Sequence, residues 1–340
     1  MHMGLLGSHE ALRYGDMVST GVDTTRTVTV RSDGDGRRVD TYLALRFPRF
    51  SRSKIQRMIR DEEIQSLHRT LKPSSMVSAG EELLVLVPEM APQGPPPPLP
   101  TVLYEDDRIL AVSKPSGMLA HPAGLTFTYG LVGIARAARP NHHVDLAHRL
   151  DRETSGINVL TKDKTANAFL KNAFFEKVPK KTYQAIVHGC PDWDQQTVDG
   201  PIGRAVDSRI RIRRAVNKKE GLPAVTTITV LQRIGPLCLV KAEPHTGRTH
   251  QIRVHLEHLG LPIVGDKMYG QPDETFIHYL DHGEDAFVRD STGFPRHCLH
   301  AAYITIPHPD GGSVSIEAPL LEDMAAIVAG AKPCWKHTEE

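Results

Sequence analysis

The N-terminal part of the chain combines strand-like and helix-like hydrophobic patterns. Residues 27–31 (TVTVR) and 83–87 (LLVLV) predict two strands. Between them, residues 37–64 predict two short helices separated by Pro48, which disfavours one continuous helix. These elements predict a small α/β domain over residues 25–88. The positions expected to face its core are Val39, Leu43 and Phe47 in the first helix and Ile55, Met58 and Ile59 in the second.

A proline-rich stretch follows this domain. Residues 88–100 (PEMAPQGPPPPLP) contain seven prolines, which cannot pair within a sheet and favour extended polyproline II. We therefore expect a semi-rigid linker over residues 89–100, followed by a larger domain over residues 101–332. We expect residues 1–24 to be a disordered terminal segment and residues 333–340 to be a short tail.

The larger domain is predicted to be rich in strands. Residues 102–114 (VLYEDDRILAVSK) are strand-like, and helices are expected near 249–259, before Gly260, and near 320–329. Strands arrive in clusters, not in strict alternation with helices, which favours an α+β fold with a mixed or antiparallel sheet over a doubly wound fold. Another helix should have one apolar face made of Ala166, Phe169, Leu170, Ala173 and Phe174. Further strands are expected near 182–188, 225–231, 237–243, 298–306 and 313–317.

The formal net charge of +1 hides a strong local separation of charge. Residues 37–60 contain eight Arg and Lys against Asp40 alone, and residues 204–219 contain seven against Asp207 alone. Residues 271–340 instead contain twelve acidic and four basic residues. Local basic surfaces of this kind are compatible with nucleic acid bound in a defined groove, although ordinary solvated faces have the same composition.

Hydrophobic content and cysteine spacing argue against several other classes of protein. A hydrophobic fraction of 40% suffices for an ordinary core, and no apolar run approaches the roughly 20 residues of a membrane span. The first residues show no secretory signal pattern, so we expect a cytoplasmic protein that does not contact a membrane. The cysteines at 190, 238, 298 and 334 form no C-x-x-C pair, which indicates reduced thiols and neither a zinc site nor a disulfide framework.

The segment HRLDRETSG (148–156) carries the main chemical signal. Asp151 lies between Arg149 and Arg152, and the apolar run INVLTK (157–162) that follows predicts a buried strand. A carboxylate at the edge of a sheet beside fixed cations stays ionised at neutral pH and can act as a base or a nucleophile. The arginines need counter-charge, which in an RNA enzyme would be phosphate. Taken alone, the pattern also fits a capping carboxylate at the end of a strand.

This segment and four others, in the same order, resemble the pseudouridine synthases of the large-subunit ribosomal RNA type. The resemblance spans roughly residues 100–320. Residues 25–88 are similar to the S4 RNA-binding module, except that QSLH (65–68) stands where that module usually has a Val-Asn-Gly turn. The four other segments are SKPSGMLAHPAG (113–124), KKTYQAIVHG (180–189), HTGRTHQIRVHLEHLGLPIVGDKMYG (245–270) and RHCLHAAYITIPHP (296–309).

The resemblance implies a central sheet with a catalytic cleft and the conversion of uridine to pseudouridine in RNA. This isomerisation is redox-neutral, so it requires neither a cofactor nor a metal in principle. Asp151 would be the catalytic aspartate, either by attack on the sugar or base or by proton abstraction from the ribose. Tyr183 would stack on the extracted base and handle a proton. Arg253 would form a bidentate pair with Asp151 that fixes the carboxylate and keeps it ionised.

The resemblance also implies how RNA is bound. Arg149 would enter the RNA helix when the target base is flipped out. We expect large-subunit ribosomal RNA as the partner, with transfer RNA as a second candidate, and a monomeric enzyme. The acidic segment 272–295 either shapes access of the substrate or is a surface excursion. The other expected RNA contacts are Arg152, Lys114, His121, Arg248 and His250 in the catalytic domain and Arg52, Lys54 and Arg57 in the S4-like domain.

Three other functions would share features of this sequence. A non-catalytic RNA-binding or assembly factor could share the fold, but Asp151, Tyr183 and Arg253 are all present. A kinase is rejected, because Leu150 splits the H-R-D sequence and no Gly-rich phosphate loop occurs. A glycosidase would need a second carboxylate near Asp151 and would release free uracil.

Overall fold

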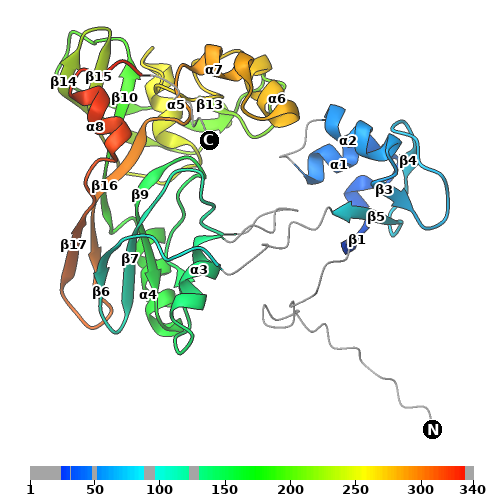
Figure 1. Cartoon of the computed structure of the whole chain (residues 1–340), viewed down its shortest axis with the longest axis horizontal. Helices are drawn as coiled ribbons and strands as arrows, with labels where there is room; N and C mark the ends of the chain where they lie inside the picture. Colours follow the sequence, from blue (N-terminus) through cyan, green and yellow to red (C-terminus); the bar gives the residue numbers. More distant parts are fainter. Residues whose placement is uncertain (1–23, 31, 48–51, 88–95, 122–129, 334–340) are drawn as a thin grey trace.

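Two units with separate hydrophobic cores make up the described chain. The N-terminal unit ends with a strand that closes at Val87, and the second unit follows after residues 88–95. Figure 1 shows the two units. Some of the predictions fall outside the described residues. They are those for residues 1–23, for Pro48, for most of the proline-rich linker and for residues 334–340. The computed structural model describes residues 24–30, 32–47, 52–87, 96–121 and 130–333.

The N-terminal unit packs two helices against a three-stranded antiparallel sheet of order β1-β5-β3. The predicted core positions of the two helices are confirmed, since five of the six are buried and Phe47 is partly buried. Leu83 and Val85 of β5 complete this core from the sheet. The elements are β1 Thr24–Thr29, η2 Ser32–Gly34, β2 Arg37–Arg38, α1 Val39–Arg46, α2 Arg52–Arg60, β3 Ile64–Ser66, β4 Met76–Val77 and β5 Glu82–Val87.

A buried carboxylate joins the two helices. Asp40 Oδ2 accepts hydrogen bonds from Arg38 Nη2 at 2.9 Å, Arg52 Nε at 3.0 Å and Gln56 Nε2 at 2.7 Å. Burial would raise the pKa of the Asp40 carboxyl, but these donors hold it well below its usual range. Arg52, expected to contact RNA, therefore already has a carboxylate partner, although 52% of its side chain remains exposed.

The second unit is built on a ten-stranded mixed sheet. Its main path is β11-β14-β15-β10-β16-β9-β7-β6, while β17 pairs with β16 and β8 with β9. Within the described part of this sheet, β16 and β9 are the parallel pair and the other pairs are antiparallel. A separate hairpin consists of β12 Ile202–Arg204 and β13 Arg214–Val216. The sheet strands are β6 Val102–Glu105, β7 Ile109–Lys114, β8 Asp145–Leu146, β9 Ser155–Thr161, β10 Lys180–His188, β11 Gln195–Asp199, β14 Val225–Ile234, β15 Leu237–Pro244, β16 Leu299–Pro307 and β17 Ser313–Glu317.

Helices cover both faces of this sheet. Side chains alternate along β7, so that Ile109 packs in a cluster with α4 and Leu110 in a cluster with α3. Helices α5 and α8 contribute to the core around β10 and β15. None of the helices in the described residues is both long enough and apolar enough to cross a membrane. The helices are α3 Leu131–Ala138, α4 Lys164–Phe175, α5 Gln251–His258, α6 Asp273–His282, α7 Ala286–Thr292 and α8 Glu322–Val328.

The strand-like segment 102–114 is not continuous, because Asp106 turns the chain between two strands. Its Oδ1 accepts hydrogen bonds from the backbone nitrogens of Arg108 and Ile109, both at 2.7 Å. An aspartate that binds the backbone two or three residues further on stabilises a turn. The segment is therefore a hairpin of β6 and β7, paired in antiparallel fashion.

The predicted apolar face of the helix α4 is wrong at Phe169, whose side chain is 41% exposed. The polar residue Asn167 is buried in its place. Its Nδ2 donates to the carbonyl oxygen of Leu146 at 3.1 Å and to Thr161 Oγ1 at 2.9 Å. These two bonds anchor the helix to β8 and β9, and they set which side of α4 faces the sheet.

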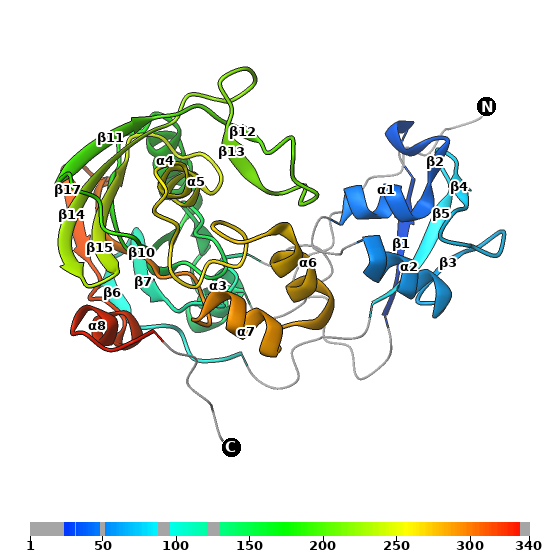
Figure 2. The same cartoon turned by 90° about the horizontal axis from the view of Figure 1, so that it is seen from above.

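The acidic segment 272–295 forms α6 and α7 and supports the β12–β13 hairpin (Figure 2). Asp273 Oδ2 accepts hydrogen bonds from Ser208 Oγ at 2.8 Å and from the backbone nitrogen of Arg209 at 2.7 Å. Asp273 Oδ1 accepts a bond from Arg213 Nη1 at 2.7 Å. The segment is therefore not a detached excursion, since it fixes the loop of a strongly basic hairpin.

Candidate active site

Asp151 lies in the loop that leads from β8 into β9, and 38% of its side chain is exposed. At the start of β9, Gly156 lies opposite Ala301 of the parallel strand β16. Gly156 has a φ of +101°, and a Cβ atom on it would lie 2.3 Å from the carbonyl oxygen of Ala301. Only glycine fits this position, which explains the glycine that ends the segment HRLDRETSG.

The residues that follow Asp151 are fixed to the segment before and within β16. Thr154 Oγ1 lies 2.8 Å from His297 Nε2, and Ser155 Oγ lies 2.9 Å from His300 Nδ1. All four of these side chains are buried. Two segments that are far apart in the sequence are therefore joined beside Asp151, and they hold its loop in one place.

Arg253, on α5, reaches Asp151 with one nitrogen only. Its Nη1 lies 3.4 Å from Asp151 Oδ2, whereas its Nε and Nη2 bind the two oxygens of Asp266 at 2.6 and 2.8 Å. The expected bidentate pair between Arg253 and Asp151 is therefore wrong, and the bidentate partner is Asp266. The physical reason is burial, because Asp266 is 1% exposed and an ionised carboxylate without water needs closely placed donors.

Asp266 and Tyr269 form a support behind Arg253. Asp266 Oδ1 also accepts hydrogen bonds from the backbone nitrogens of Met268 at 2.9 Å and Tyr269 at 3.0 Å. The Tyr269 ring covers the guanidinium, with Cζ of Arg253 4.7 Å from the ring centroid. The Tyr269 hydroxyl lies 2.8 Å from Nδ1 of His250. These contacts hold Arg253 in an orientation that directs Nη1 toward Asp151.

The surrounding charges keep Asp151 ionised. Burial raises the pKa of Asp151, but the protonated forms of His250 and His297 and the Arg253 guanidinium lower it, and the pKa lies below its ordinary value. Burial also lowers the pKa of His250 to about 4 and of His297 to about 3, so both imidazoles are neutral at neutral pH. Arg253 is therefore the permanent cation beside this carboxylate. An ionised, fixed and accessible carboxylate is suited to act as a base or a nucleophile.

Tyr183 lies at an irregular point of β10. The register between β10 and β16 shifts between Thr182 and Tyr183, as in a β-bulge. Tyr183 pairs with Ala301, which is also the residue opposite Gly156, so β10 brings the tyrosine to the side of the Asp151 loop. Burial and the nearby Asp151 raise the pKa of Tyr183, and its hydroxyl therefore stays protonated at neutral pH.

Lys114 occupies an internal position, which contradicts its expected contact with RNA. The side chain is fully buried, and its Nζ donates to the carbonyl oxygens of Pro115 at 2.9 Å, Met118 at 2.9 Å and Arg152 at 3.0 Å. Burial lowers the pKa of Lys114 to about 7. Because an ammonium group has three donors and all are used here, Lys114 ties the loop after β7 to the Asp151 loop.

The other predicted RNA contacts lie at different distances from Asp151. Arg149 and Arg152 are its exposed neighbours in the same loop, and Arg152 Nε donates to the carbonyl oxygen of Gly117 at 3.1 Å. His250 reaches the site through Tyr269, as described above. Arg248 precedes α5 and donates a hydrogen bond to the carbonyl oxygen of Pro223 at 3.1 Å. The remaining predicted contacts are the exposed His121, and Arg52, Lys54 and Arg57 on α2 of the N-terminal unit.

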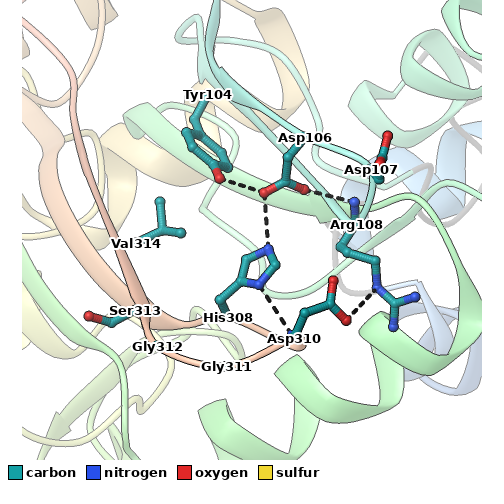
Figure 3. A pocket seen from close by; sticks show the side chains of 10 residues that line it. All are labelled: Tyr104, Asp106, Asp107, Arg108, His308, Asp310, Gly311, Gly312, Ser313 and Val314. Carbon is teal, nitrogen blue, oxygen red and sulfur yellow. Dashed lines mark hydrogen bonds and ion pairs between the residues drawn. The ribbon is translucent and has the colours of Figure 1, made fainter.

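A polar hollow of about 320 Å³ lies between the β6–β7 turn and the β16–β17 turn (Figure 3). The hollow lies at the opposite end of β9 from Asp151. Arg108, which lines the hollow, precedes Ile109, and Ile109 pairs with Thr161, the last residue of β9. His308 uses both ring nitrogens there, since Nε2 lies 3.0 Å from Asp106 Oδ2 and Nδ1 accepts a bond from the backbone nitrogen of Asp310 at 3.2 Å. The hollow therefore offers no free imidazole for catalysis.

Three residues of the site were missed by sequence reasoning: Asp266, Tyr269 and His297. Asp266 and Tyr269 lie in the segment GDKMYG, which resembles a surface loop when only its glycines and charges are considered. A usable signal was present in α5, where Arg253 falls among apolar residues on a helix that is largely buried. A buried arginine needs a carboxylate partner, and Asp266 is an acid close behind it in the sequence.

The fold and the site define a class of protein. The family model described as RNA pseudouridylate synthase matches residues 108–258, a range that includes Asp151, Tyr183 and Arg253. Together with relatives that are 33% and 34% identical over most of the chain, this match shows that the chain belongs to the RNA pseudouridine synthase family. The protein is therefore an isomerase that acts on RNA, and its ten-stranded mixed sheet is that of a pseudouridine synthase fold.

Several relatives match nearly the whole chain. The chain is 33% identical over 316 residues to "Uncharacterized RNA pseudouridine synthase YlyB" of Bacillus subtilis, covering 88% of this chain and 96% of the relative. It is 34% identical over 320 residues to "Ribosomal large subunit pseudouridine synthase C" of Escherichia coli, covering 90% of this chain and 97% of the relative. The solved structure "Human RNA Pseudouridylate Synthase Domain Containing 4" is similar with 25% identity and a TM-score of 0.53, covering 67% of this chain and 91% of that chain.

Proposed function

We propose that this enzyme isomerises specific uridines of large-subunit ribosomal RNA to pseudouridine, with Asp151 as the catalytic carboxylate. The observation that carries the proposal is the ionised, accessible Asp151 beside an arginine that is itself fixed by Asp266. The substrate class is supported by the name of the relative from Escherichia coli, a ribosomal large subunit enzyme that aligns over 97% of its length. We propose a monomer that works in the cytoplasm.

The chemistry requires the N-glycosidic bond to break, the base to rotate and a C–C bond to form. Asp151 starts the reaction, and two routes share this requirement: attack of the carboxylate on the sugar or base, and removal of a proton from the ribose. Tyr183, protonated at neutral pH, stacks on the base through its ring and donates a hydrogen bond through its hydroxyl. Arg253 stabilises the ionised form of Asp151 before the reaction begins.

Access to the glycosidic bond requires the target uridine to leave its stack. Base extraction of this kind places the nucleotide in the site at a cost of a few kcal/mol. Arg149 is exposed two residues before Asp151, so its guanidinium can take the place that the base vacates. Arg152, on the other side of Asp151, is available to the phosphates that flank the target nucleotide.

Binding of RNA away from Asp151 is assigned to two basic surfaces. The N-terminal unit acts as an S4-like RNA-binding domain through Lys54 and Arg57 of α2, with Arg52 at its edge. The β12–β13 hairpin presents Arg204 and Arg211, and burial together with the nearby Arg204 lowers the pKa of Arg211. Closely spaced guanidinium groups favour a polyanion as partner.

The direct test is to map pseudouridine in RNA treated with the purified protein. Unmodified ribosomal and transfer RNA transcripts are incubated with the protein or with Asp151→Asn, and carbodiimide adducts are located by primer extension. We expect new stops at one or a few uridines of large-subunit ribosomal RNA, absent with the variant, which should still bind RNA. Turnover by Asp151→Asn, release of free uracil, or stops on transfer RNA alone would each contradict part of the proposal.

The role of the N-terminal unit is tested by salt dependence. Each phosphate contact contributes about 0.7–0.9 to the slope of log K against log salt. Arg57→Ala should weaken RNA binding and reduce this slope by roughly that amount, with the same single-turnover rate at saturating RNA. Lys332→Ala, which removes an exposed cation near the other end of the described chain, is the matched control. Equal slopes for the protein and Arg57→Ala would argue against an RNA contact through α2.

A further inference from the structure

Two cysteines lie side by side at one end of the sheet. Cys190 follows β10 closely, and Cys238 lies in β15, the neighbouring strand. Gly189, with a φ of +90°, bends the chain between the end of β10 and Cys190. The two sulfurs are 3.2 Å apart, so a disulfide bond of about 2.05 Å needs an approach of only about 1.2 Å.

The two thiols differ in their access to solvent. Cys190 is exposed, whereas Cys238 is 0% exposed in the core of the sheet. Burial and the contact with Cys190 raise the pKa of Cys238 to about 11, so that it stays a thiol at neutral pH. Arg233 holds the loop after Cys190 by donating to the carbonyl oxygens of Pro191 at 3.3 Å and Trp193 at 3.1 Å. A dissolved oxidant therefore meets Cys190 first and finds the second sulfur already in place.

We propose that Cys190 and Cys238 are a peroxide-responsive pair that closes reversibly into an intramolecular disulfide. The Cys190 sulfur attacks one oxygen of hydrogen peroxide, the O–O bond breaks, and a sulfenic acid and one water are formed. The Cys238 sulfur then attacks the sulfenic sulfur, the S–O bond breaks, and the departing hydroxide leaves with the Cys238 proton as a second water. Two thiols lose two electrons in total, and one peroxide gains them. A dithiol reverses the reaction by exchange.

The cross-link stabilises the protein and leaves its chemistry in place. It closes the segment between Cys190 and Cys238, which carries the basic β12–β13 hairpin. Such a bond acts mainly by restricting the unfolded chain. Beyond Tyr183, β10 continues for five residues to His188, roughly 17 Å, so the bond lies far from the Asp151 loop. Oxidation therefore raises the thermal midpoint of unfolding while the rate of pseudouridine formation stays the same.

The test uses the full chain with Cys334→Ser, which leaves Cys298 as the one thiol outside the pair. After treatment with hydrogen peroxide, a thiol titration of the denatured protein should fall from three thiols to one. The intact mass should fall by two hydrogen atoms, and peptide mapping should find Cys190 joined to Cys238. Dithiothreitol should restore all three thiols and return the thermal midpoint to its starting value.

Cys190→Ser in the same background is the matched control, because it removes the exposed sulfur and leaves the core unchanged. Its mass, thiol count and thermal midpoint should not respond to the same treatment. Three results would overturn the proposal: unchanged thiols in the parent protein, conversion of Cys190 to a sulfinic acid while Cys238 stays a free thiol, or a disulfide that joins two separate chains. A loss of activity on formation of the bond would contradict the placement of the pair away from the active site.

Discussion

Replacement of Asp266 by Asn tests whether the buried carboxylate orients Arg253 toward Asp151. Asp266 Oδ1 accepts three hydrogen bonds, one from Arg253 and two from backbone nitrogens, whereas Oδ2 accepts one from Arg253 Nε at 2.6 Å. An asparagine keeps most of these bonds only with its oxygen at the Oδ1 position. Its NH₂ group then faces Arg253 Nε, so two donors meet and the guanidinium loses one of its two bonds to this residue.

The magnitude follows from the burial of the pair. Breaking a buried ion pair from one side costs about 3–5 kcal/mol. Arg253 retains a contact of 3.4 Å to Asp151, so we take the lower end, about 3 kcal/mol. For a folded unit of this size, 1 kcal/mol corresponds to about 2–4 °C, and the thermal midpoint should fall by about 6–12 °C. Turnover should fall on the order of 100-fold, because a shift of about 1 Å in an orienting group has that effect.

The assay combines thermal unfolding with single-turnover pseudouridine formation and RNA binding. Asp266→Asn should reduce stability and turnover together, with little change in RNA affinity, because Asp266 is buried. Asp323→Asn is the matched control. Asp323 forms a bidentate pair of the same kind with Arg296, at 2.9 and 2.7 Å, but its side chain is 31% exposed. Water can replace part of that pair, so the control should lose less stability and keep its rate.

Two outcomes would refute this reasoning. If Asp266→Asn unfolds at the parental midpoint and turns over at the parental rate, Arg253 does not depend on Asp266 for its position. If Asp323→Asn loses as much turnover as Asp266→Asn, the effect is general to the fold and does not reach Asp151 through Arg253.

Three further predictions concern the same region. Gly156→Ala should destabilise the protein by more than about 3 kcal/mol, because the new Cβ would lie 2.3 Å from the Ala301 carbonyl oxygen at a backbone φ of +101°. A thermal midpoint of unfolding near the parental value would contradict that contact. The pKa values of about 4 for His250 and about 3 for His297 lie below the ordinary value of 6.5, so the unfolded chain binds more protons than the folded chain between about pH 6.5 and 4. The free energy of unfolding should therefore fall as the pH decreases through this range, by up to about 1.4 kcal/mol per pH unit for each histidine. His297→Gln should flatten this slope, and an unchanged plot of thermal midpoint against pH would argue against a buried neutral imidazole. Activity should survive EDTA, because isomerisation needs no metal, and a chelator-sensitive rate would point to a metal that the chemistry does not require.

Periodic parts of the chain were predictable because each element buries a regular set of side chains. The faces of α1 and α2 follow from spacing alone, and the same reasoning places α5 and the strands β14, β15 and β17 within a few residues. It fails where one polar contact outweighs the pattern. Asp106 breaks an apparent strand, and Asn167 is buried on α4 while Phe169 is exposed.

The site was less predictable than the fold. The types of the site residues were recognisable in their motifs. Which side chains pair with each other, however, depends on interatomic distances, and the spacing of residues along the sequence does not give these. Arg253 has two carboxylates within reach, and the buried one takes both strong bonds. Lys114 carries a charge that suggests an RNA contact, yet three carbonyl oxygens surround its ammonium group inside the protein.

The pairing of β9 with β16 also sets when the active site can exist during synthesis. Thr154 and Ser155 contact His297 and His300, which lie 143 and 145 residues further along the chain. At about 5–20 residues per second, a ribosome needs roughly 7–30 s to add this stretch. During that interval Asp151 belongs to a loop without its supporting strand, beside the ribosomal RNA of the particle that is making it. We therefore expect an unfinished copy to be inert, so that modification of RNA waits for a chain that is nearly complete.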